Sequence, residues 1–465
     1  MINKKIFKAY DIRGTYPDQI NKEAIELIMK GYYTLLCRRT GKKKVNIALG
    51  CDMRISSPEL HQTASEVLKN QGAIVYDLGQ IATPTLYFSV NKFLLDGGVQ
   101  ISASHNPKEY NGVKMVQRDG NKLIKFGSKT GLGEILEIIE QGSYSKSDMQ
   151  GEIIPKPDVV NLECQEAIVE IGSPEISMKT VVSDPANSMG ILPLTELFKH
   201  IPTKHIMIND FLDGTFPAHQ ADPLQHKTLR QLQDKVLAEK ADIGICTDGD
   251  ADRTMFINEK GEIIPATIIT TLIAQEILRD NPGQKILVDI RYIKNVQKMV
   301  TKMGGTIGLT PVGHALITQQ VNEEKAIFAG ESSGHYYFLN TAGCESTVRV
   351  ILYVLRVLGR ENRPISEIIN SMMVSYESGE SNFKLPESVT SQEVIKNICA
   401  KYSDGTLNEI DGIAISYDDW RFSIRSSNTE PLIRLNVEGD QIDKVKSEEK
   451  KLQDLIIGFG AHKEE

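Results

Sequence analysis

Asp248, Asp250 and Asp252 alternate in a short loop that follows an apolar run at residues 241–246. If the loop is extended, all three carboxylates can point at one centre, where their like charges repel one another unless a cation neutralises them. Carboxylate oxygens are hard ligands and favour magnesium or calcium. The spacing is not that of an EF-hand, since Arg253 stands where that loop needs glycine. A solvated acidic turn is the alternative, but α/β proteins form their sites where strands end, so the pattern favours a metal site.

A second loop, at residues 98–107, offers a nucleophile. A strand pattern ends there in a small, polar turn that holds Ser104 beside His105 and stops at Pro107. A serine hydroxyl next to a histidine suggests a nucleophile or a site that carries a transferred group. Taken alone, the pair favours a turn whose side chains cap the neighbouring backbone.

Two more loops are rich in hydrogen-bonding groups. In residues 330–335, glycines frame Glu331 and Ser333, whose side chains could bind neighbouring sugar hydroxyls, although a plain turn fits this loop equally well. In residues 425–434, hydroxyl and amide side chains lie between two arginines, which favours a phosphate clamp over an ordinary hairpin. The side chains that such a clamp would use are Arg425, Ser427, Asn428, Thr429 and Arg434.

Strands and helices must alternate to position these loops. Short apolar runs alternate with helical periodicity, which predicts α/β units around mostly parallel sheets. The expected strands are residues 45–49, 73–76, 180–183, 205–208, 241–246 and 285–290, and the expected helices are about 24–36, 58–69, 191–199, 267–278 and 346–358. Because the same order recurs three times, we expect one divergent α/β unit to be used three times.

The C-terminal stretch has a different pattern. Three segments alternate by period two, which predicts an antiparallel meander with one face open to water. These segments are residues 412–417, 420–425 and 431–437, with helices expected at 391–399 and 441–457. The expected domains are residues 1–155, 156–262, 263–372 and 373–465, each carrying one of the four loops.

Composition excludes several classes of protein. The 465 residues suffice for three or four domains, and 61 acidic against 53 basic residues give a net charge of −8. Nucleic-acid and membrane-surface binders are normally basic. The longest apolar run, residues 350–355, is far too short for a membrane helix, and no apolar stretch follows the N-terminal basic residues. Six scattered cysteines favour reduced thiols. We therefore expect a cytoplasmic protein that binds neither nucleic acid nor a membrane.

Together the four loops describe a phosphate-carrying serine, a divalent metal, a reader of sugar hydroxyls and a phosphate clamp. In this order and at these separations they resemble the phosphohexomutase superfamily, specifically its phosphoglucomutase/phosphomannomutase group. The resemblance spans essentially the full length. Shorter matching segments lie at residues 10–14, 50–56, 213–217 and 313–316.

The resemblance implies a four-domain, heart-shaped architecture around a central cleft, with three mixed α/β sandwich domains and a C-terminal α+β domain with an antiparallel sheet. It implies an intramolecular phosphotransferase that interconverts hexose 1-phosphate and hexose 6-phosphate, of mannose, glucose or both. Ser104 would carry the phosphoryl group, and a hexose 1,6-bisphosphate would be both intermediate and activator. Mg²⁺ would be held by the phosphoserine and the three aspartates. The expected partners are small sugar phosphates, and the expected assembly is a monomer or small homo-oligomer.

The resemblance also implies roles for single residues. Arg13, His105 and Lys114 would act beside the phosphoserine, and Arg253 would flank the metal. The substrate-binding residues would be Arg291, His314, Glu331, Ser333, His335, Arg425, Ser427, Asn428, Thr429 and Arg434. Arg291 replaces a lysine that is often found at this position, and because arginine stays protonated, an acid–base role is not expected of it.

Three alternatives stay open at this point. A phosphoglucosamine mutase would usually carry glutamine where this chain has Ser332. A non-catalytic sugar-phosphate-binding relative would not need the intact Ser104 and aspartate triplet, and a metal phosphatase would release phosphate to water. Residues 183–190 depart from the glycine-rich turn that relatives often carry, which we expect to concern the packing of the second domain more than the chemistry.

Overall fold

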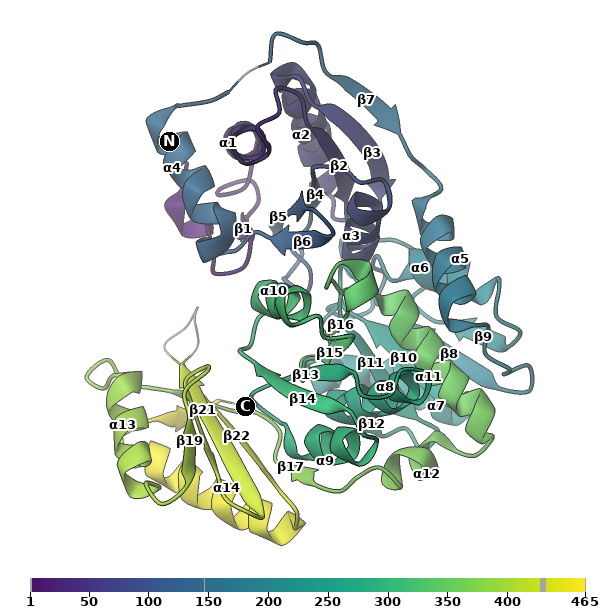
Figure 1. Cartoon of the computed structure of the whole chain (residues 1–465), viewed down its shortest axis with the longest axis vertical. Helices are drawn as coiled ribbons and strands as arrows, with labels where there is room; N and C mark the ends of the chain where they lie inside the picture. The colour runs from purple at the N-terminus through teal and green to yellow at the C-terminus, as the bar shows by residue number, and fades with distance from the viewer. Residues whose placement is uncertain (1, 146, 427–431, 465) are drawn as a thin grey trace.

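The computed structural model describes residues 2–145, 147–426 and 432–464. The chain folds into four units, each built on its own sheet, which follow one another along an arc from the top of Figure 1 to its lower left. The first three are α/β units and the fourth has an antiparallel sheet, so the expected four-domain architecture is confirmed. Within the described residues, no helix is both long and apolar enough to cross a membrane.

The three α/β units share one strand order. Each contains four strands in the order 2-1-3-4, where the first three run parallel and the fourth returns antiparallel to the third. The strands are β2 (Asn46–Cys51), β3 (Ile74–Gln80), β4 (Gly97–Ile101) and β5 (Tyr110–Asp119) in the first unit; β8 (Thr180–Asp184), β9 (Lys204–Met207), β10 (Ile243–Thr247) and β11 (Thr254–Asn258) in the second; and β13 (Lys285–Asp289), β14 (Thr306–Thr310), β15 (Phe328–Gly330) and β16 (Tyr336–Phe338) in the third. The expected repetition of an α/β unit is therefore present in the topology.

Short strands extend the first two sheets. They are β1 (Ile12–Thr15), β6 (Lys122–Lys125) and β7 (Glu152–Pro155) in the first and β12 (Ile263–Ile264) in the second. Strand β1 pairs with β5, and β5 pairs in turn with β4. The first sheet therefore brings the segment around Arg13 close to the end of β4.

Helices flank the three sheets. They are α1 (Lys22–Thr40), α2 (Ser57–Gln71), α3 (Thr83–Lys92) and α4 (Gly133–Gln141); α5 (Val159–Ile171), α6 (Ile191–Phe198) and α7 (Arg230–Glu239); and α8 (Ala266–Asp280), α9 (Lys294–Lys302), α10 (His314–Glu324), α11 (Thr347–Glu361) and α12 (Ile365–Asn370). Helices α3, α4, α5, α7, α9, α10 and α12 were not predicted from the sequence. In α3, residues 83–90 are all buried. A helix that is buried on every side lacks the apolar stripe that reveals an amphipathic helix.

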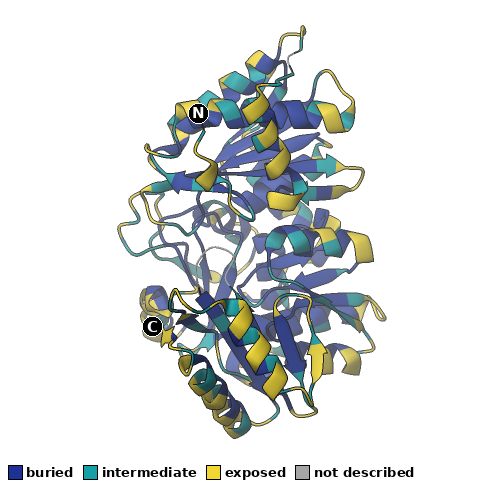
Figure 2. Ribbon diagram, turned by 90° about the vertical axis from the view of Figure 1, so that its left-hand side faces the viewer, coloured by how far each residue is buried: buried dark blue, intermediate teal, exposed yellow. Residues whose placement is uncertain are grey.

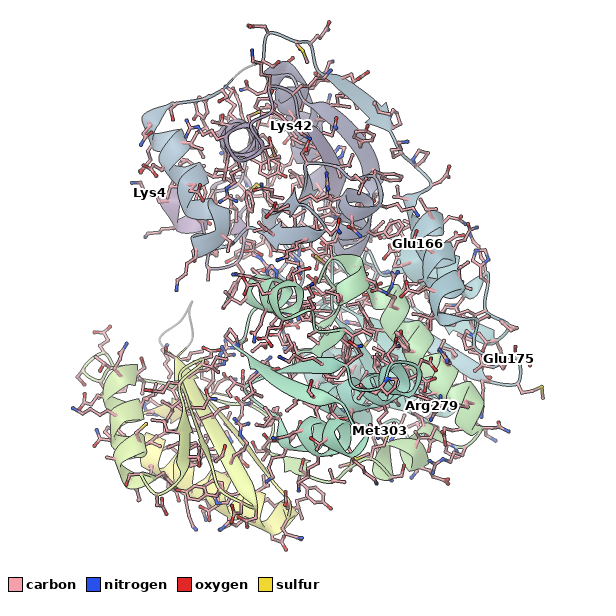
Figure 3. All side chains as sticks on the ribbon, viewed as in Figure 1. Lys4, Lys42, Glu166, Glu175, Arg279 and Met303 are labelled. Carbon is pink, nitrogen blue, oxygen red and sulfur yellow. The ribbon has the colours of Figure 1, made fainter. Side chains whose placement is uncertain are left out.

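One apolar core runs through the second and third units, where α11 packs against α5, α6 and α8. The first and fourth units each have a core of their own. Figure 2 shows the buried strands inside and the exposed residues on the outer helices. Charged side chains such as Lys4 and Arg279 project from the outer surface (Figure 3).

The fourth unit forms a sheet in the order β19-β20-β21-β22-β18-β23, with β17 also paired to β22. Its elements are β17 (Tyr376–Glu377), β18 (Ser381–Lys384), α13 (Ser391–Lys401), β19 (Thr406–Asn408), β20 (Ile413–Ser416), β21 (Trp420–Ser426), β22 (Leu432–Gly439), α14 (Ile442–Ile457) and β23 (His462–Lys463). All its pairings are antiparallel, as predicted.

One expectation about this sheet is wrong, because the third unit covers its polar face. Arg421 of β21 and Glu438 of β22 form a buried ion pair 2.7 Å long. Arg421 also donates to the carbonyls of Ile290 and Arg291, and Glu438 accepts from backbone N–H groups at the start of α9. Polar side chains on alternate positions therefore dock this sheet onto the third unit instead of facing water.

Candidate active site

Ser104 stands on a tight turn directly after β4. Its φ is +51°, a left-handed conformation that is uncommon for residues other than glycine. Its backbone N–H donates to Ser102 Oγ at 3.0 Å, and its hydroxyl donates to Asp248 Oδ2 at 2.7 Å. His105 Nδ1 lies 3.1 Å from the same hydroxyl. The turn thus holds the serine hydroxyl between a carboxylate and an imidazole.

A buried arginine fixes this turn, and the sequence analysis missed it. The Arg54 guanidinium donates at 2.6–2.9 Å to four backbone carbonyls, those of Ser104, Asn106, Pro107 and Tyr110. Asp52 lies 3.2 Å away. Burial, partly offset by Asp52, lowers the pKa of Arg54. Backbone acceptors leave no signal in a sequence, so only the position of Arg54 in the matching segment 50–56 pointed to it.

The three aspartates lie together where β10 turns back into β11. Carboxylate oxygens of Asp248, Asp250 and Asp252 all lie within 4.8 Å of one another, and all three residues are buried. Asp248 Oδ1 accepts the backbone N–H groups of Asp252 and Arg253 at 3.1 and 3.2 Å, which curls the loop around its first carboxylate. The structure therefore brings the triplet and Ser104 into one place.

Lys114 of β5 partly balances this negative charge. Its ammonium donates to Asp250 Oδ2 and, at 2.7 Å, to Asp252 Oδ2. Although burial opposes it, these carboxylates raise the pKa of Lys114. Burial and the two neighbouring aspartates raise the pKa of Asp248. Burial by itself would raise the pKa of Asp252, but Lys114 and His335 hold this pKa well below its usual range. Together, the Lys114 ammonium and His335 still provide fewer positive charges than the three carboxylates need.

The residues present fit a divalent cation of the magnesium type. Asp250 Oδ1 is buried and has no hydrogen-bond partner among the described residues, as expected of an atom that awaits a ligand. All three donors are carboxylates, the ligands that hard cations prefer. Asp252, His335 and Glu345 form another close group. Lys125, however, pairs with Glu345, which leaves this second group less suited to a cation.

The loop 183–190, which departs from the family pattern, lies against the aspartate loop. Ser188 Oγ donates to the Asp248 carbonyl at 3.2 Å, and the Met189 N–H donates to the Gly249 carbonyl at 3.2 Å. From the first unit, Thr83 Oγ1 donates to Asp250 Oδ2 at 2.5 Å. The turn therefore supports the aspartate loop directly, beyond the packing role expected for it.

A cavity of about 590 Å³ opens over Ser104. Expected site residues on its wall are Arg13, Ser104, His105, Lys114, Asp252, Arg253, His314, His335 and Arg434. Arg13 is held by Asp11 and Asn106. Burial, reinforced by the positive charge of Arg253, lowers the pKa of His105 well below its usual range. Burial likewise lowers the pKa of His314. Burial therefore favours the neutral form of His105.

The expected sugar loop lies beside this cavity and contributes His335 to its wall. Burial by itself would lower the pKa of His335, but Asp252 and Glu331 raise this pKa to about 9. Glu331 is itself engaged by Arg291 Nη2 at 3.1 Å and the Tyr337 hydroxyl at 2.9 Å. Ser333 Oγ lies 3.0 Å from His335 Nδ1. Among the described residues, Glu331 and Ser333 contact His335 and do not themselves line the cavity.

The expected phosphate clamp is described in part. Ser427, Asn428 and Thr429 lie outside the described residues. Arg425 of β21 and Arg434 of β22 lie opposite each other in the sheet, and Arg434 reaches the cavity wall. Arg291, at the end of β13, lies near the same group of charges. Guanidinium groups from two units thus converge on one side of the cavity that holds Ser104.

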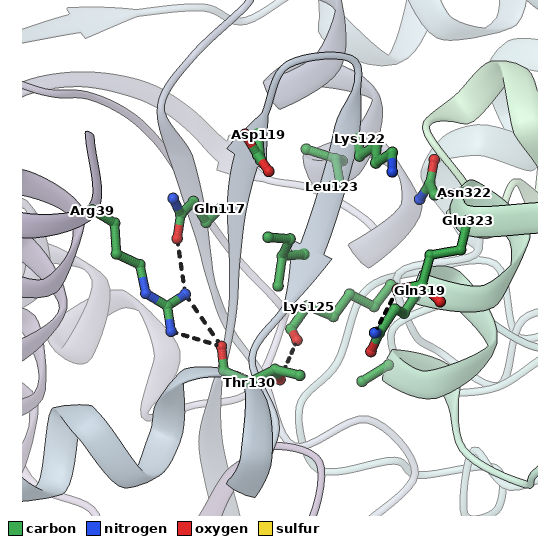
Figure 4. A pocket seen from close by; sticks show the side chains of 12 residues that line it. Arg39, Gln117, Asp119, Lys122, Leu123, Lys125, Thr130, Gln319, Asn322 and Glu323 are labelled. Carbon is green, nitrogen blue, oxygen red and sulfur yellow. Dashed lines mark hydrogen bonds between the residues drawn. The ribbon is translucent and has the colours of Figure 1, made fainter.

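A separate cavity of about 510 Å³ lies between the first and third units, behind the hairpin of β5 and β6 (Figure 4). On one wall, Arg39 donates to Gln117 Oε1 and to the Thr130 carbonyl. On the opposite wall, α10 presents polar side chains. At its floor, Lys125 forms a buried ion pair with Glu345, which ties the first unit to the third. None of the expected site residues that the structure describes lines this cavity.

Comparison with known proteins gives matches along the whole chain. Four domain families of phosphoglucomutase/phosphomannomutase match: α/β/α domain I at residues 4–142, domain II at 163–261, domain III at 266–376 and the C-terminal domain at 380–455. A phosphomannomutase of Methanocaldococcus jannaschii is 33% identical over 98% of both chains, and one of Escherichia coli K12 is 33% identical over 93% of this chain and 94% of its own. A crystal structure of a phosphoglucomutase/phosphomannomutase family protein from Burkholderia thailandensis superimposes with a TM-score of 0.87 at 26% identity, covering 99% of this chain and 98% of that one.

Proposed function

This chain belongs to the phosphoglucomutase/phosphomannomutase family and is a hexose-phosphate mutase, and we propose that it moves the phosphoryl group through Ser104. The observation that carries the proposal is the Ser104 hydroxyl itself. It lies on the wall of a 590 Å³ cavity, within 2.7 Å of Asp248 and beside Lys114 and Arg13. The proposed substrates are the 1- and 6-phosphates of mannose, glucose or both, since the curated relatives are named phosphomannomutases.

In the first step, a sugar hydroxyl would attack the phosphorus of phosphorylated Ser104. A bond from the sugar oxygen to phosphorus forms as the bond from phosphorus to Ser104 Oγ breaks, which gives a hexose 1,6-bisphosphate. The sugar hydroxyl would give up its proton and the leaving Ser104 Oγ would take one up, so no net proton is released; His105 Nδ1, 3.1 Å from that oxygen, would pass this proton, and the return step would reverse the transfer. The bisphosphate would then turn and return its other phosphate to Ser104. Added bisphosphate would act as an activator by phosphorylating Ser104.

Positive charge must balance the phosphoryl group beside the aspartates. Asp248, Asp250, Asp252 and the phosphate on Ser104 would hold Mg²⁺, which would offset the charge that develops during transfer. Lys114 and Arg13 would contact the transferring group from the cavity wall, and Arg253 would flank the metal. This division of roles is supported by the raised pKa of Lys114, which keeps its side chain cationic.

The opposite end of the hexose phosphate would lie toward the third and fourth units. Arg291, Arg425 and Arg434, with Ser427, Asn428 and Thr429, would hold the phosphate that is not reacting. His314 and His335 would contact the sugar from the cavity wall, and Glu331 and Ser333 would orient His335. The unpaired cysteines, four of them buried, suit work in the reducing cytoplasm, either as a monomer or as a small homo-oligomer.

Initial rates with mannose 1-phosphate, glucose 1-phosphate and glucosamine 1-phosphate, each with Mg²⁺ and glucose 1,6-bisphosphate, test this proposal. We expect isomerisation of at least one of the first two and little release of inorganic phosphate. Preference for glucosamine 1-phosphate would favour a phosphoglucosamine mutase, and net phosphate release would favour a phosphatase. Binding without turnover by fully phosphorylated protein would contradict the proposed activity.

A further inference from the structure

One carboxylate lies among the three arginines expected to bind phosphate. Glu380 Oε2 is 3.6 Å from Arg425 Nη2 and 3.9 Å from Arg291 Nη1, and Glu380 Oε1 is 3.4 Å from Arg434 Nη1. Glu380 lies between β17 and β18, directly after Gly379, whose φ of +81° turns the chain. Since Arg291 belongs to the third unit and the other two arginines to the fourth, Glu380 joins the two units.

The arginine pair needs a counter-ion even in the free protein. Arg425 and Arg434 occupy directly opposite positions in β21 and β22, where like charges destabilise a sheet. Burial, together with the positive charge of Arg291, lowers the pKa of Arg425, whereas Glu380 acts in the opposite direction. Arg291 is also neutralised by Asp289 and Glu331. Glu380 therefore offsets a repulsion that the strand register imposes.

The contacts of Glu380 are nevertheless long. A charge-assisted hydrogen bond is typically about 2.7–2.9 Å, whereas these contacts are 3.4–3.9 Å. Glu380 Oε2 and the Nε atoms of Arg425 and Arg434 are buried, and within the described part of the chain none has a hydrogen-bond partner. Apart from one long hydrogen bond from Arg434 Nη1 to Glu380 Oε1, Glu380 thus holds the arginines by charge, and the two Nε donors have no partner among the described residues and can meet a closer anion. Within the described residues, the ion pairs of Arg425 and Arg434 share this single carboxylate, which leaves positive charge that suits a phosphate dianion.

We propose that Glu380 occupies the place of the substrate's non-reacting phosphate: it neutralises Arg425 and Arg434 in the free enzyme and is displaced when a sugar phosphate binds. This inference rests on the proposed mutase function. The bisphosphate must leave the clamp once in each cycle in order to turn. When the phosphate leaves the clamp, the Glu380 carboxylate returns to the arginines and lowers the free energy of the empty clamp. Glu380 therefore weakens the binding of the sugar phosphate and speeds the reorientation of the bisphosphate. Glu380 is a positioning residue, because it acts on substrate through the arginines.

Glu380→Gln tests the proposal, since it keeps the shape and removes the charge. In a full-length Ser104→Ala background, which prevents turnover, titration calorimetry with glucose 1-phosphate is expected to show binding about tenfold tighter than with Glu380 present. With Ser104 intact, we expect both KM and kcat to fall. Glu380→Asp keeps the charge but withdraws it by one methylene, and an intermediate gain of roughly threefold is expected. Glu380→Asp also carries the test if Glu380→Gln does not fold.

Glu393→Gln is the matched control, because it removes the same charge from the exposed side of α13. It is expected to leave the affinity for glucose 1-phosphate and the rates unchanged. Weaker or unaltered binding in Glu380→Gln would overturn the inference and would make Glu380 a support that merely orients the arginines. The two proposals fail separately: a wild-type enzyme that isomerises sugar phosphates with an unaltered Glu380→Gln affinity refutes the inference alone, whereas a wild type without isomerisation refutes the proposed function.

Discussion

Ser104 Oγ and Asp248 Oδ2 are joined by a 2.7 Å hydrogen bond, although 144 positions separate the two residues in the sequence. The bond spans the first and second units and connects the proposed phosphate carrier with the first of the three aspartates. Once Ser104 carries a phosphoryl group, the Asp248 carboxylate faces a second anion. The same contact that places the nucleophile therefore creates the need for a cation.

Ser104→Ala is expected to lower mutase turnover by several orders of magnitude, because it removes the hydroxyl that would carry the phosphoryl group beside the aspartates. Folding should be preserved, since among the described residues the hydroxyl forms hydrogen bonds with Asp248 and His105 alone. Coupled assays and intact-mass measurement check this, the latter by the loss of one phosphate. Ser65→Ala in α2 is the control and should retain activity. Turnover at the wild-type rate in Ser104→Ala would refute the assignment.

Arg54→Met is expected to destabilise the protein by about 3–5 kcal/mol, because it leaves Asp52 buried without its cation and four loop carbonyls without their donor. Turnover should fall as well, since the turn that carries Ser104 loses its support. Urea unfolding and initial rates measure the two effects. Arg38→Met, which removes an exposed arginine of α1, is the control. An Arg54→Met protein with wild-type stability would contradict the supporting role.

Lys114→Met is expected to make the protein more dependent on Mg²⁺, because the three buried aspartates lose the cation that now contacts two of them. The rise in Tm on adding Mg²⁺ should be larger than in the wild type, and phosphoryl transfer should be slower. Differential scanning calorimetry with and without chelator measures this. The exposed Lys122 offers the control Lys122→Met. A smaller Mg²⁺ effect in Lys114→Met would argue against a cation among these aspartates.

Glu163 should make stability depend on pH. This buried carboxyl of α5 accepts a hydrogen bond from Thr85 of α3, and burial raises its pKa from 4.5 to about 7. Between these values the folded protein binds the proton more tightly than the unfolded chain, so this contribution to stability is complete below pH 4.5 and lost as the pH rises through 7. The loss amounts to about 3 kcal/mol at most.

Glu163→Gln removes this titration while keeping an acceptor for Thr85. We expect it to be more stable than the wild type at pH 8 and about equal to it near pH 5. Unfolding curves across this range measure the difference. Glu166→Gln, in the same helix and half-exposed, should change little over the same range. If the difference in unfolding free energy between Glu163→Gln and wild type does not vary with pH, Glu163 does not titrate with a raised pKa and the prediction is wrong.

Arg425→Ala and Glu331→Ala are each expected to slow the forward and reverse reactions by similar factors, because both orientations of the bisphosphate use Arg425 and the His335 side chain that Glu331 orients. Loss of a charge-assisted contact costs about 1.5–3 kcal/mol, or roughly ten- to a hundredfold in kcat/KM. Added glucose 1,6-bisphosphate should restore part of the rate. Initial rates from both substrates check this. Rates unchanged in both directions would make the segment around Arg425 a simple hairpin.

The sequence alone determined the α/β units, the antiparallel C-terminal sheet and the four loops, because these depend on local features. Apolar periodicity is visible within ten residues, and the aspartate triplet or the Ser104 turn carries its chemistry in adjacent side chains. The family resemblance was carried by the same short segments. For this reason the predicted strands and helices lie close to those of the structure. Several helices were not predicted, and one of them, α3, is buried on all sides and gave no periodic signal.

Only the tertiary structure decided which of these groups meet. The partners of Arg54 are backbone carbonyls, which every residue type has, so no pattern identifies them. The sequence predicted a solvent-exposed polar face for β21 and β22, because the residues of the third unit that cover this face lie more than a hundred positions away along the chain. Glu380 lies among three arginines only because strand register and the docking of two units place them there. Charge interactions depend on distance and burial, and the fold alone sets both.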